Sequence, residues 1–275
     1  MIKIGIEIEG VFNGNYTPEE IGEYHESERL NNFWNVERDS SINRSFIFDE
    51  EEKIEYISNI LYSEEELKKA LISFRNSFGS KKQLNKLMYF NKSCGCHIHF
   101  GLEKKFFYKV IPYDLLIKTR NYFFKELNNS DLRKELKDSV KKQYFRSYAM
   151  KLKKEAYNKG YTPRYCEFNV SSEKQGRGLE WRSFNLRNVE TWKEFNKMFE
   201  IMFKTSQYLY NLFYEGYSFK KSLRIERKLL KECIEEKKTN EIINKPLIYE
   251  YETTQQPLRI MEIGNEIIKE EIIIK

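Results

Sequence analysis

Cysteine, histidine, proline and glycine are all sparse in this chain of 275 residues, which contains 4, 3, 5 and 12 of them. The four cysteines (Cys94, Cys96, Cys166 and Cys233) are too few and too scattered for a disulfide framework. No apolar run reaches membrane-spanning length, and the opening MIKIGIEIEG lacks the long apolar core and cleavage site of a signal peptide. We therefore expect a cytoplasmic protein with no membrane partner.

A strong charge of one sign is also missing. The chain has 48 basic and 42 acidic residues, which gives a net charge of +6. This modest excess suits an anionic small ligand such as a nucleotide, but it does not indicate a nucleic-acid partner. Aromatic residues make up 15% of the chain, which excludes a largely disordered protein.

Strand and helix patterns intermingle along the chain, which predicts a single α+β domain with helical insertions over 1–275. Strands are predicted at about 1–12, 32–39, 46–58, 95–102, 161–172 and 178–187. Helices are predicted from 17, at 63–78, in two or three pieces within 112–159, at 190–214 and at 219–238, with a hairpin or edge strands after 247. Thr17, followed by Pro18, and Ser63 are the expected capping residues of the first two helices.

Three predicted strands each carry a polar pair at a spacing of two residues. The pairs are Glu7 and Glu9, His97 and His99, and Glu180 and Arg182. Residues two apart on a strand point to the same face, and the residues between these pairs are apolar. Each strand is therefore expected to bury one face and to present a polar pair on the other.

The chemistry of these pairs favours a site for a metal and a nucleotide. Carboxylate oxygens with an imidazole suit Mg²⁺ or Mn²⁺, which also hold substrate phosphates. Arginine side chains beside such a site stabilise the charge that develops on a transferring phosphoryl group.

At these residues the chain resembles the amidoligases, the carboxylate–amine ligase branch of the glutamine synthetase and glutamate–cysteine ligase superfamily. Six segments, in the family's order, cover about the first two thirds of the chain: GIEIEG at 5–10, WNVERDSSI at 34–42, IEYIS at 54–58, CGCHIH at 94–99, Arg164-Tyr165 with Asn169, and LEWRSF at 179–184. They resemble G-x-E-x-E, W-x-V-x-x-D-G-S-L, E-I-V-S-P, C-G-L-H-V-H, R-Y…N and I-E-F-R-x-F. Ser41 replaces the family's glycine, shifted by one position, and Asn59 replaces its proline.

The resemblance implies a glutamine-synthetase-like fold, a curved antiparallel β-sheet with helices packed on its convex face and the site in the concavity. The motifs lie within 1–190, and the helices and C-terminal hairpin of 190–275 are expected to pack on this domain. By position in the motifs, the implied metal ligands are Glu7, Glu9, Glu55, His97 and Glu180. These positions bind two or three divalent cations that bridge the ATP phosphates.

The resemblance also implies the remaining roles. His99 matches a position that touches nucleotide phosphate, and Arg164 and Arg182 match arginines that hold the γ-phosphate and an acyl phosphate. Arg146 is a third arginine candidate. Asp39 has two interpretations: it binds the amine substrate or it caps a turn.

The implied activity is an ATP-dependent carboxylate–amine ligase that uses Mg²⁺ or Mn²⁺ and an acyl-phosphate intermediate, acting on a peptide, a protein side chain or a cell-wall-type substrate. Two alternatives from other classes are a two-metal nuclease or phosphoesterase, and a non-catalytic nucleotide-binding relative of the fold. A zinc site built from Cys94, Cys96, His97 and His99 is disfavoured, because on a regular strand the cysteines point away from the histidines.

Overall fold

The structure is a computed structural model that describes residues 3–23, 26–79, 81–101, 111–144, 149–158, 166–169 and 179–216, with 252–253 and 256–257. The chain divides into two compact units, Met1–Gly216 and Tyr217–Lys275. In the second unit, β9 (Glu252–Thr253) pairs antiparallel with β10 (Gln256–Pro257), as the hairpin prediction requires. The helix predicted at 219–238 lies outside the described residues, and a single domain over 1–275 stays a prediction.

An eight-stranded antiparallel sheet forms the centre of the first unit. Its strand order is β2-β3-β4-β1-β6-β8-β7, and β5 also pairs with β1. The strands are β1 (Lys3–Asn13), β2 (Glu28–Arg29), β3 (Trp34–Arg38), β4 (Glu51–Ser58), β5 (Met88–Tyr89), β6 (Cys96–Gly101), β7 (Phe168–Asn169) and β8 (Leu179–Phe184). The predicted α+β class is therefore confirmed, with an antiparallel sheet.

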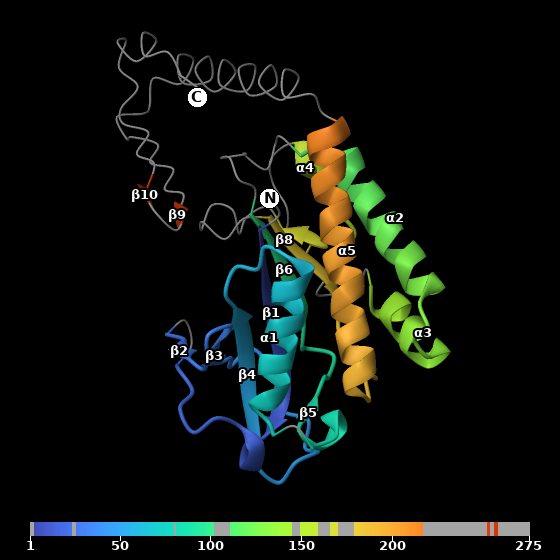
Figure 1. The fold of residues 1–275 in the computed structure, drawn as a ribbon. Coiled ribbons are helices and arrows are strands. Elements are labelled where there is room, and N and C mark those ends of the chain that lie inside the picture. Colours follow the sequence, from blue (N-terminus) through green and yellow to red (C-terminus); the bar gives the residue numbers. More distant parts are fainter. Residues whose placement is uncertain are drawn as a thin grey trace, which may run out of the picture. The chain divides into compact units, whose positions relative to one another are not determined.

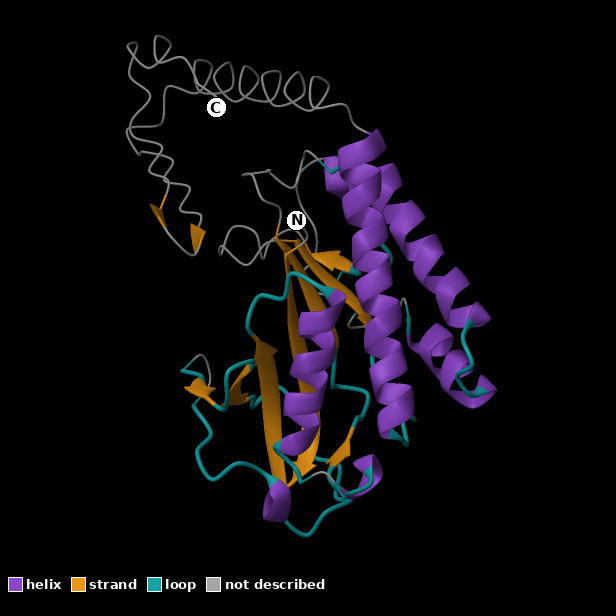
Figure 2. Cartoon of the chain, in the orientation of Figure 1, coloured by secondary structure: helices purple, strands orange, loops and turns teal. Residues whose placement is uncertain are grey.

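The helices of the first unit lie on one side of this sheet (Figures 1 and 2). They are α1 (Glu64–Asn76), α2 (Tyr113–Asn129), α3 (Lys134–Gln143), α4 (Lys154–Asn158) and α5 (Trp192–Gly216), with short 3₁₀ turns η1 (Gly14–Tyr16) and η2 (Leu84–Lys86). Ser63 caps α1 as predicted, because its side chain accepts a hydrogen bond from the Glu66 amide at 3.1 Å.

The core lies between the sheet and these helices. Ile4, Ile6 and Ile8 of β1 are fully buried, as period-two alternation predicts. The Phe74 ring on α1 stacks on the Phe195 ring of α5, with centroids 5.5 Å apart, and the Trp34 indole donates a hydrogen bond to the Ala70 carbonyl. One face of the sheet is thereby committed to packing, which leaves the other face for polar side chains.

Two predictions of local structure are wrong. Thr17 does not begin a helix, because both its backbone N–H and its hydroxyl donate back to the Gly14 carbonyl and close η1. The chain then runs beside β3, where Gly22 exchanges backbone hydrogen bonds with Val36 and Arg38. The strand predicted from Phe46 begins only at Glu51, because a bend precedes it and Phe46 has a positive φ of 60°.

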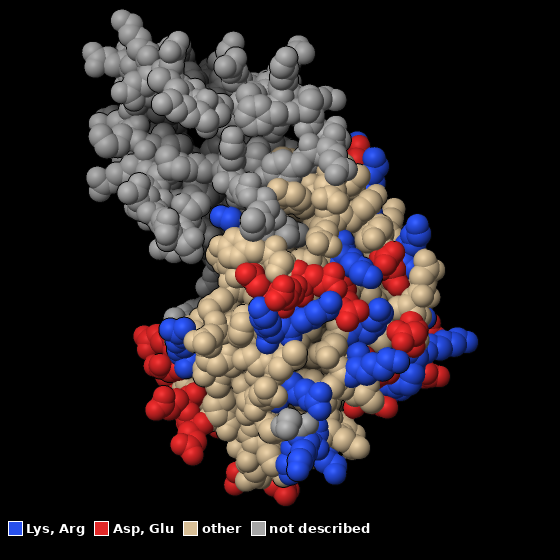
Figure 3. All heavy atoms as spheres, in the orientation of Figure 1, with Lys and Arg blue, Asp and Glu red and all other residues tan. Residues whose placement is uncertain are grey.

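The surface carries charged groups of both signs. On the face drawn in Figure 3, basic and acidic groups are intermixed and do not form one large basic field. Within the described part of the chain, no helix combines the length and apolarity needed to cross a bilayer.

Candidate metal site

The polar pairs predicted from the sequence lie on adjacent strands in the middle of the sheet. Glu7 of β1 lies directly opposite His97 of β6, and His99 lies opposite Glu180 of β8. Residues that oppose each other in an antiparallel ladder point to the same face. Since Ile6 and Ile8 occupy the packed face, this cluster lies on the face away from the helices.

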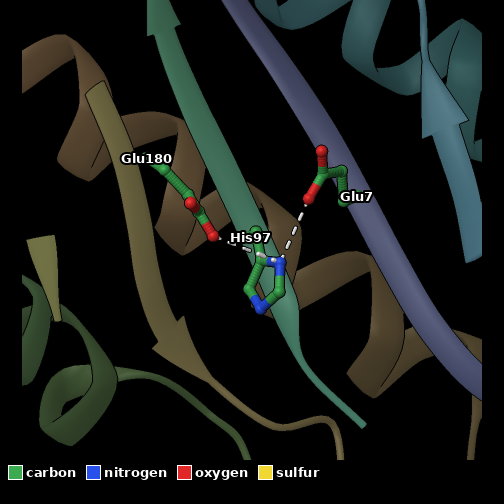
Figure 4. Close-up of side chains that lie close together, drawn as sticks. All are labelled: Glu7, His97 and Glu180. Carbon is green, nitrogen blue, oxygen red and sulfur yellow. Dashed lines mark hydrogen bonds and ion pairs between the residues drawn. The ribbon is translucent and has the colours of Figure 1, made fainter. Parts of the chain in front are cut away.

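Glu7, His97 and Glu180 form the centre of the site (Figure 4). Each offers one ligand atom, and these atoms all lie within 4.8 Å of one another. His97 Nδ1 is 3.1 Å from Glu7 Oε2, 3.6 Å from Glu180 Oε1 and 3.8 Å from Glu9 Oε1. His99 Nε2 lies 2.9 Å from the other oxygen of Glu7. The two histidines therefore contact both oxygens of one carboxylate.

The carboxylates of Glu9 and Glu180 are oriented by specific donors. The Gly95 amide donates to Glu9 Oε2 at 2.6 Å, and the Asn169 side chain donates to Glu180 Oε2 at 2.7 Å. Arg182 Nε lies 2.6 Å from Glu180 Oε1. Gly95 also leaves room for the His97 ring, since a Cβ at position 95 would lie 2.3 Å from His97 Nε2.

The pKa values of the buried carboxyl groups shift in opposite directions: that of Glu7 is lowered, and those of Glu9 and Glu55 are raised. Burial acts to raise the pKa of Glu7, but His99 and His97 outweigh it and hold the pKa well below its usual value. Burial is also the largest influence on Glu9, whose pKa is raised with the help of Asp39 despite the attraction of His97. Burial, with repulsion from Glu7, Glu9 and Glu37, raises the pKa of Glu55 well above its usual value.

These shifts indicate a surplus of negative charge. Glu55 lies opposite both Glu9 and Glu37 in the ladders, so three carboxylates follow one another across β1, β4 and β3. Buried charges of one sign are costly unless a counter-charge is present.

The donor set fits a hard divalent cation. The two carboxylates and one imidazole of Glu7, Glu180 and His97, with the Glu9 carboxylate close by, match the ligand preference of Mg²⁺ or Mn²⁺. Glu180 Oε1 supports this fit: the atom is buried and no hydrogen bond of good geometry reaches it, although Arg182 Nε and His97 Nδ1 are close. A cation at this point would satisfy that oxygen and offset the repulsion among the carboxylates.

Seven of the predicted site residues lie close to one another on the sheet. The structure brings together Glu7, Glu9, Glu55, His97, His99, Glu180 and Arg182. Arg146 and Arg164 lie outside the described residues. Asp39 is buried, and its Oδ1 accepts a hydrogen bond from the Ser41 amide at 2.8 Å, which is the turn-capping arrangement. Its predicted role toward an amine stays a prediction.

Three participants were not predicted as site residues: Glu37, Gly95 and Asn169. Glu37 is buried at the end of β3 and precedes Asp39 by two residues, so the same alternation that marked the other pairs could have identified it. Asn169 belongs to the segment that resembles R-Y…N, but its role beside Glu180 follows only from the pairing of β7 with β8. Gly95 acts through its backbone and its lack of a side chain, and neither is visible as a motif of ligand residues.

The cysteines beside this site do not join it. Cys96 is fully buried on the packed face, and burial raises the pKa of Cys94 to about 12 and that of Cys96 well above its usual value. Cys96 lies opposite Ile8 in the ladder, so its thiol points away from Glu7, His97 and Glu180.

Comparisons of the chain with protein-family models, with curated proteins and with solved structures find no match. The fold and the site define an α+β protein with an antiparallel sheet that carries a buried Glu–His–Glu group on the face away from its helices.

Proposed function

We propose that the protein is an ATP-dependent carboxylate–amine ligase of glutamine-synthetase-like fold. The observation that carries the proposal is the convergence of Glu7, His97 and Glu180 from three adjacent strands, with Arg182 bound to one of the carboxylates. The antiparallel sheet, with helices on one side and polar residues on the other, supports the same fold.

A divalent cation, Mg²⁺ or Mn²⁺, would be held by Glu7, Glu180 and His97, with Glu9 and Glu55 beside them. When bound, it neutralises the phosphates of ATP and supports transfer of the γ-phosphoryl group. In this proposal His99, whose Nε2 contacts Glu7 at 2.9 Å, donates to a phosphate oxygen, as the sequence resemblance implies.

The reaction has two steps. An oxygen of the substrate carboxylate attacks the γ-phosphorus of ATP, the bond to the β-phosphate oxygen breaks, and ADP leaves. The amine then attacks the carbonyl carbon of the acyl phosphate, inorganic phosphate leaves, and the nitrogen loses a proton to give the amide. Activation is needed because a free carboxylate is a poor electrophile.

In this scheme Arg182 acts on the transferring phosphoryl group, because its planar guanidinium can donate to two oxygens at once. Glu180 holds Arg182 in place through the contact of 2.6 Å. Arg164 and Arg146 are further candidates for phosphate contacts, and Asp39 for the amine, from the sequence resemblance alone.

Thermal unfolding with and without Mg²⁺, ATP and chelator tests the nucleotide site. ATP should raise the melting temperature only when Mg²⁺ or Mn²⁺ is present, since the metal screens the triphosphate from the carboxylates. Glu7→Gln should reduce the stabilisation by ATP with Mg²⁺, whereas Glu65→Gln at an exposed position of α1 should not. Equal stabilisation by ATP in excess chelator would contradict the proposal.

Release of ADP, measured over a panel of carboxylates and amines, tests the ligase activity itself. The ligase proposal requires ADP release that depends on both substrates. Metal-dependent cleavage of phosphodiesters with no need for an amine would instead identify a phosphoesterase.

A further inference from the structure

The connection between β3 and β4 exposes two large apolar side chains. Phe46 is 84% exposed and Ile47 is 52% exposed. The β4 end of this connection meets the sheet at the end opposite the amino terminus of β1, where Glu51 pairs with Asn13 (Figure 1). Contiguous exposed apolar groups are a feature of interaction surfaces.

The loop is held in one shape by a carboxylate. Glu51 accepts hydrogen bonds from the Ser45 amide at 3.0 Å, from the Ser45 hydroxyl, from the Ile47 amide at 2.9 Å and from the Phe48 amide at 3.4 Å. A second anchor joins Asn43 to the segment before β6, through the Ser93 hydroxyl and the Asn91 side chain. The exposed apolar pair therefore sits on a pre-organised loop.

Phe46 itself has an unfavourable backbone conformation. Its φ of 60° lies in the left-handed region, which a bulky residue rarely occupies. Glycine would occupy this position without steric cost. A phenylalanine that is strained and also exposed contributes little to the fold, which points to a role outside it.

The charge around the loop indicates the kind of partner. Within 44–52, four carboxylates (Asp49, Glu50, Glu51 and Glu52) accompany one basic residue, Arg44, in a chain whose net charge is +6. Asp49 and Glu50 are exposed. An acidic rim beside an apolar tip complements a segment that carries apolar side chains next to lysine or arginine, and it disfavours an anionic membrane surface.

We propose that the loop Asn43–Glu52, defined here as the docking loop, binds a polypeptide segment in which apolar side chains are flanked by basic residues. Phe46 and Ile47 supply the apolar contact, and Asp49 and Glu50 supply the charge. Glu51 supplies the pre-organisation that lowers the entropic cost of binding. This interaction goes beyond the ligase proposal and does not depend on it.

The test is fluorescence anisotropy with the full chain and a labelled Gly-Lys-Leu-Phe-Lys-Gly peptide as the probe. The peptides Gly-Glu-Leu-Phe-Glu-Gly and Gly-Lys-Ser-Ser-Lys-Gly are the comparisons, and both should bind at least fivefold more weakly. The double variant Phe46→Gly, Ile47→Ser keeps the backbone preference of the loop and should weaken binding of the probe at least fivefold. Ile72→Ser, which removes an apolar side chain that is 58% exposed on α1, is the matched control and should bind normally.

Glu51→Ala should weaken probe binding while the melting temperature changes little, because the apolar side chains remain but the loop is no longer held. Equal binding of all three peptides, or no effect of the double variant, would overturn the proposal. So would self-association of the wild type, seen by sedimentation and lost in the double variant without peptide binding, since the occupant would then be a second copy. Neither readout uses ATP or a metal, so failure of the ligase proposal leaves this test unaffected.

Discussion

Gly95 shows how strongly one residue can control the arrangement of the ligands. A methyl group at this position would lie 2.3 Å from His97 Nε2 and 2.9 Å from Glu9 Oε2, so both side chains would have to move. We expect Gly95→Ala to lower Mn²⁺ affinity at least tenfold, because ligand geometry controls metal affinity. Mn²⁺ binding is measured by calorimetry.

Gly5→Ala is the matched control for this variant. Gly5 lies on the same face of the sheet, and a Cβ there would meet the His99 Cβ at 3.7 Å, an ordinary contact. Its Mn²⁺ affinity should remain within about twofold of wild type. Unchanged Mn²⁺ affinity in Gly95→Ala would show that His97 and Glu9 do not hold the ion.

Arg182 provides the sharpest residue-scale test of the ligase proposal. Arg182→Lys should leave the fold and most of the ATP affinity intact but slow turnover by about a hundredfold, since a lysine cannot donate bidentately to developing charge. Glu180→Ala should instead weaken metal and ATP binding together. ADP release and ATP affinity are measured for both variants. Normal turnover in Arg182→Lys would exclude a role in phosphoryl transfer, and loss of the fold would assign the residue a structural role.

At the scale of elements, the ion pair of Arg133 with Glu194 connects the starts of α3 and α5. Arg133, which precedes α3, contacts both oxygens of Glu194 on α5, at 2.5 and 3.2 Å, and donates to the Asn188 carbonyl at 2.9 Å. Burial opposes ionisation of Glu194, but hydrogen bonds from Arg133 and from the Glu190 amide outweigh it and lower the pKa of the carboxyl group.

The lowered pKa of Glu194 determines the pH dependence of this ion pair. Because the folded-state pKa lies below the unfolded value, the stabilisation is fully present above about pH 4.5 and is lost as the pH falls through the folded-state value. Glu194→Gln should lower the free energy of unfolding by about 1–2 kcal/mol at pH 7, allowing for the partial exposure of Arg133. Urea unfolding between pH 3 and 7 should show the two proteins converging as the pH falls.

Breaking an exposed pair on α1 is the comparison for Glu194. Lys69 and Glu65 are 2.8 Å apart and largely exposed, so Lys69→Gln should lower the free energy of unfolding at pH 7 far less than Glu194→Gln does. An equally small effect of Glu194→Gln would mean that the partly buried pair does not hold the two helices.

The elements themselves were largely predictable from the sequence, because their signals are local. Alternation located β1 and β6, and the Ser63 cap located the start of α1. Which strands pair with each other was not predictable on physical grounds. The pairing of β1 with β6 joins residues about 90 positions apart, and no local sequence signal encodes it. The failure at Thr17 has a similar origin, because the same hydroxyl can cap a following helix or bond backward, and the neighbouring β3 decides which.

At the scale of the whole molecule, every described site residue belongs to the unit Met1–Gly216. This unit contains the complete eight-stranded sheet and its buried core. A fragment of residues 1–216 should therefore unfold cooperatively and bind Mn²⁺ within about threefold of the affinity of the full chain. The measurements are urea unfolding and calorimetry, with Glu7→Gln in the same fragment as the control. A fragment that is folded but does not bind Mn²⁺ would place part of the site in residues 217–275.

The two hydrogen-bond donors that orient Glu9 and Glu180 differ in how a mutation can remove them. The donor to Glu9 is a backbone amide at position 95, which every residue except proline supplies, while the space beside it accepts only glycine. The donor to Glu180 is the Asn169 side chain, which a single codon change can replace. A single substitution can thus change the donor to Glu180 on the β8 side, while the donor to Glu9 on the β1 side is fixed by the path of the chain.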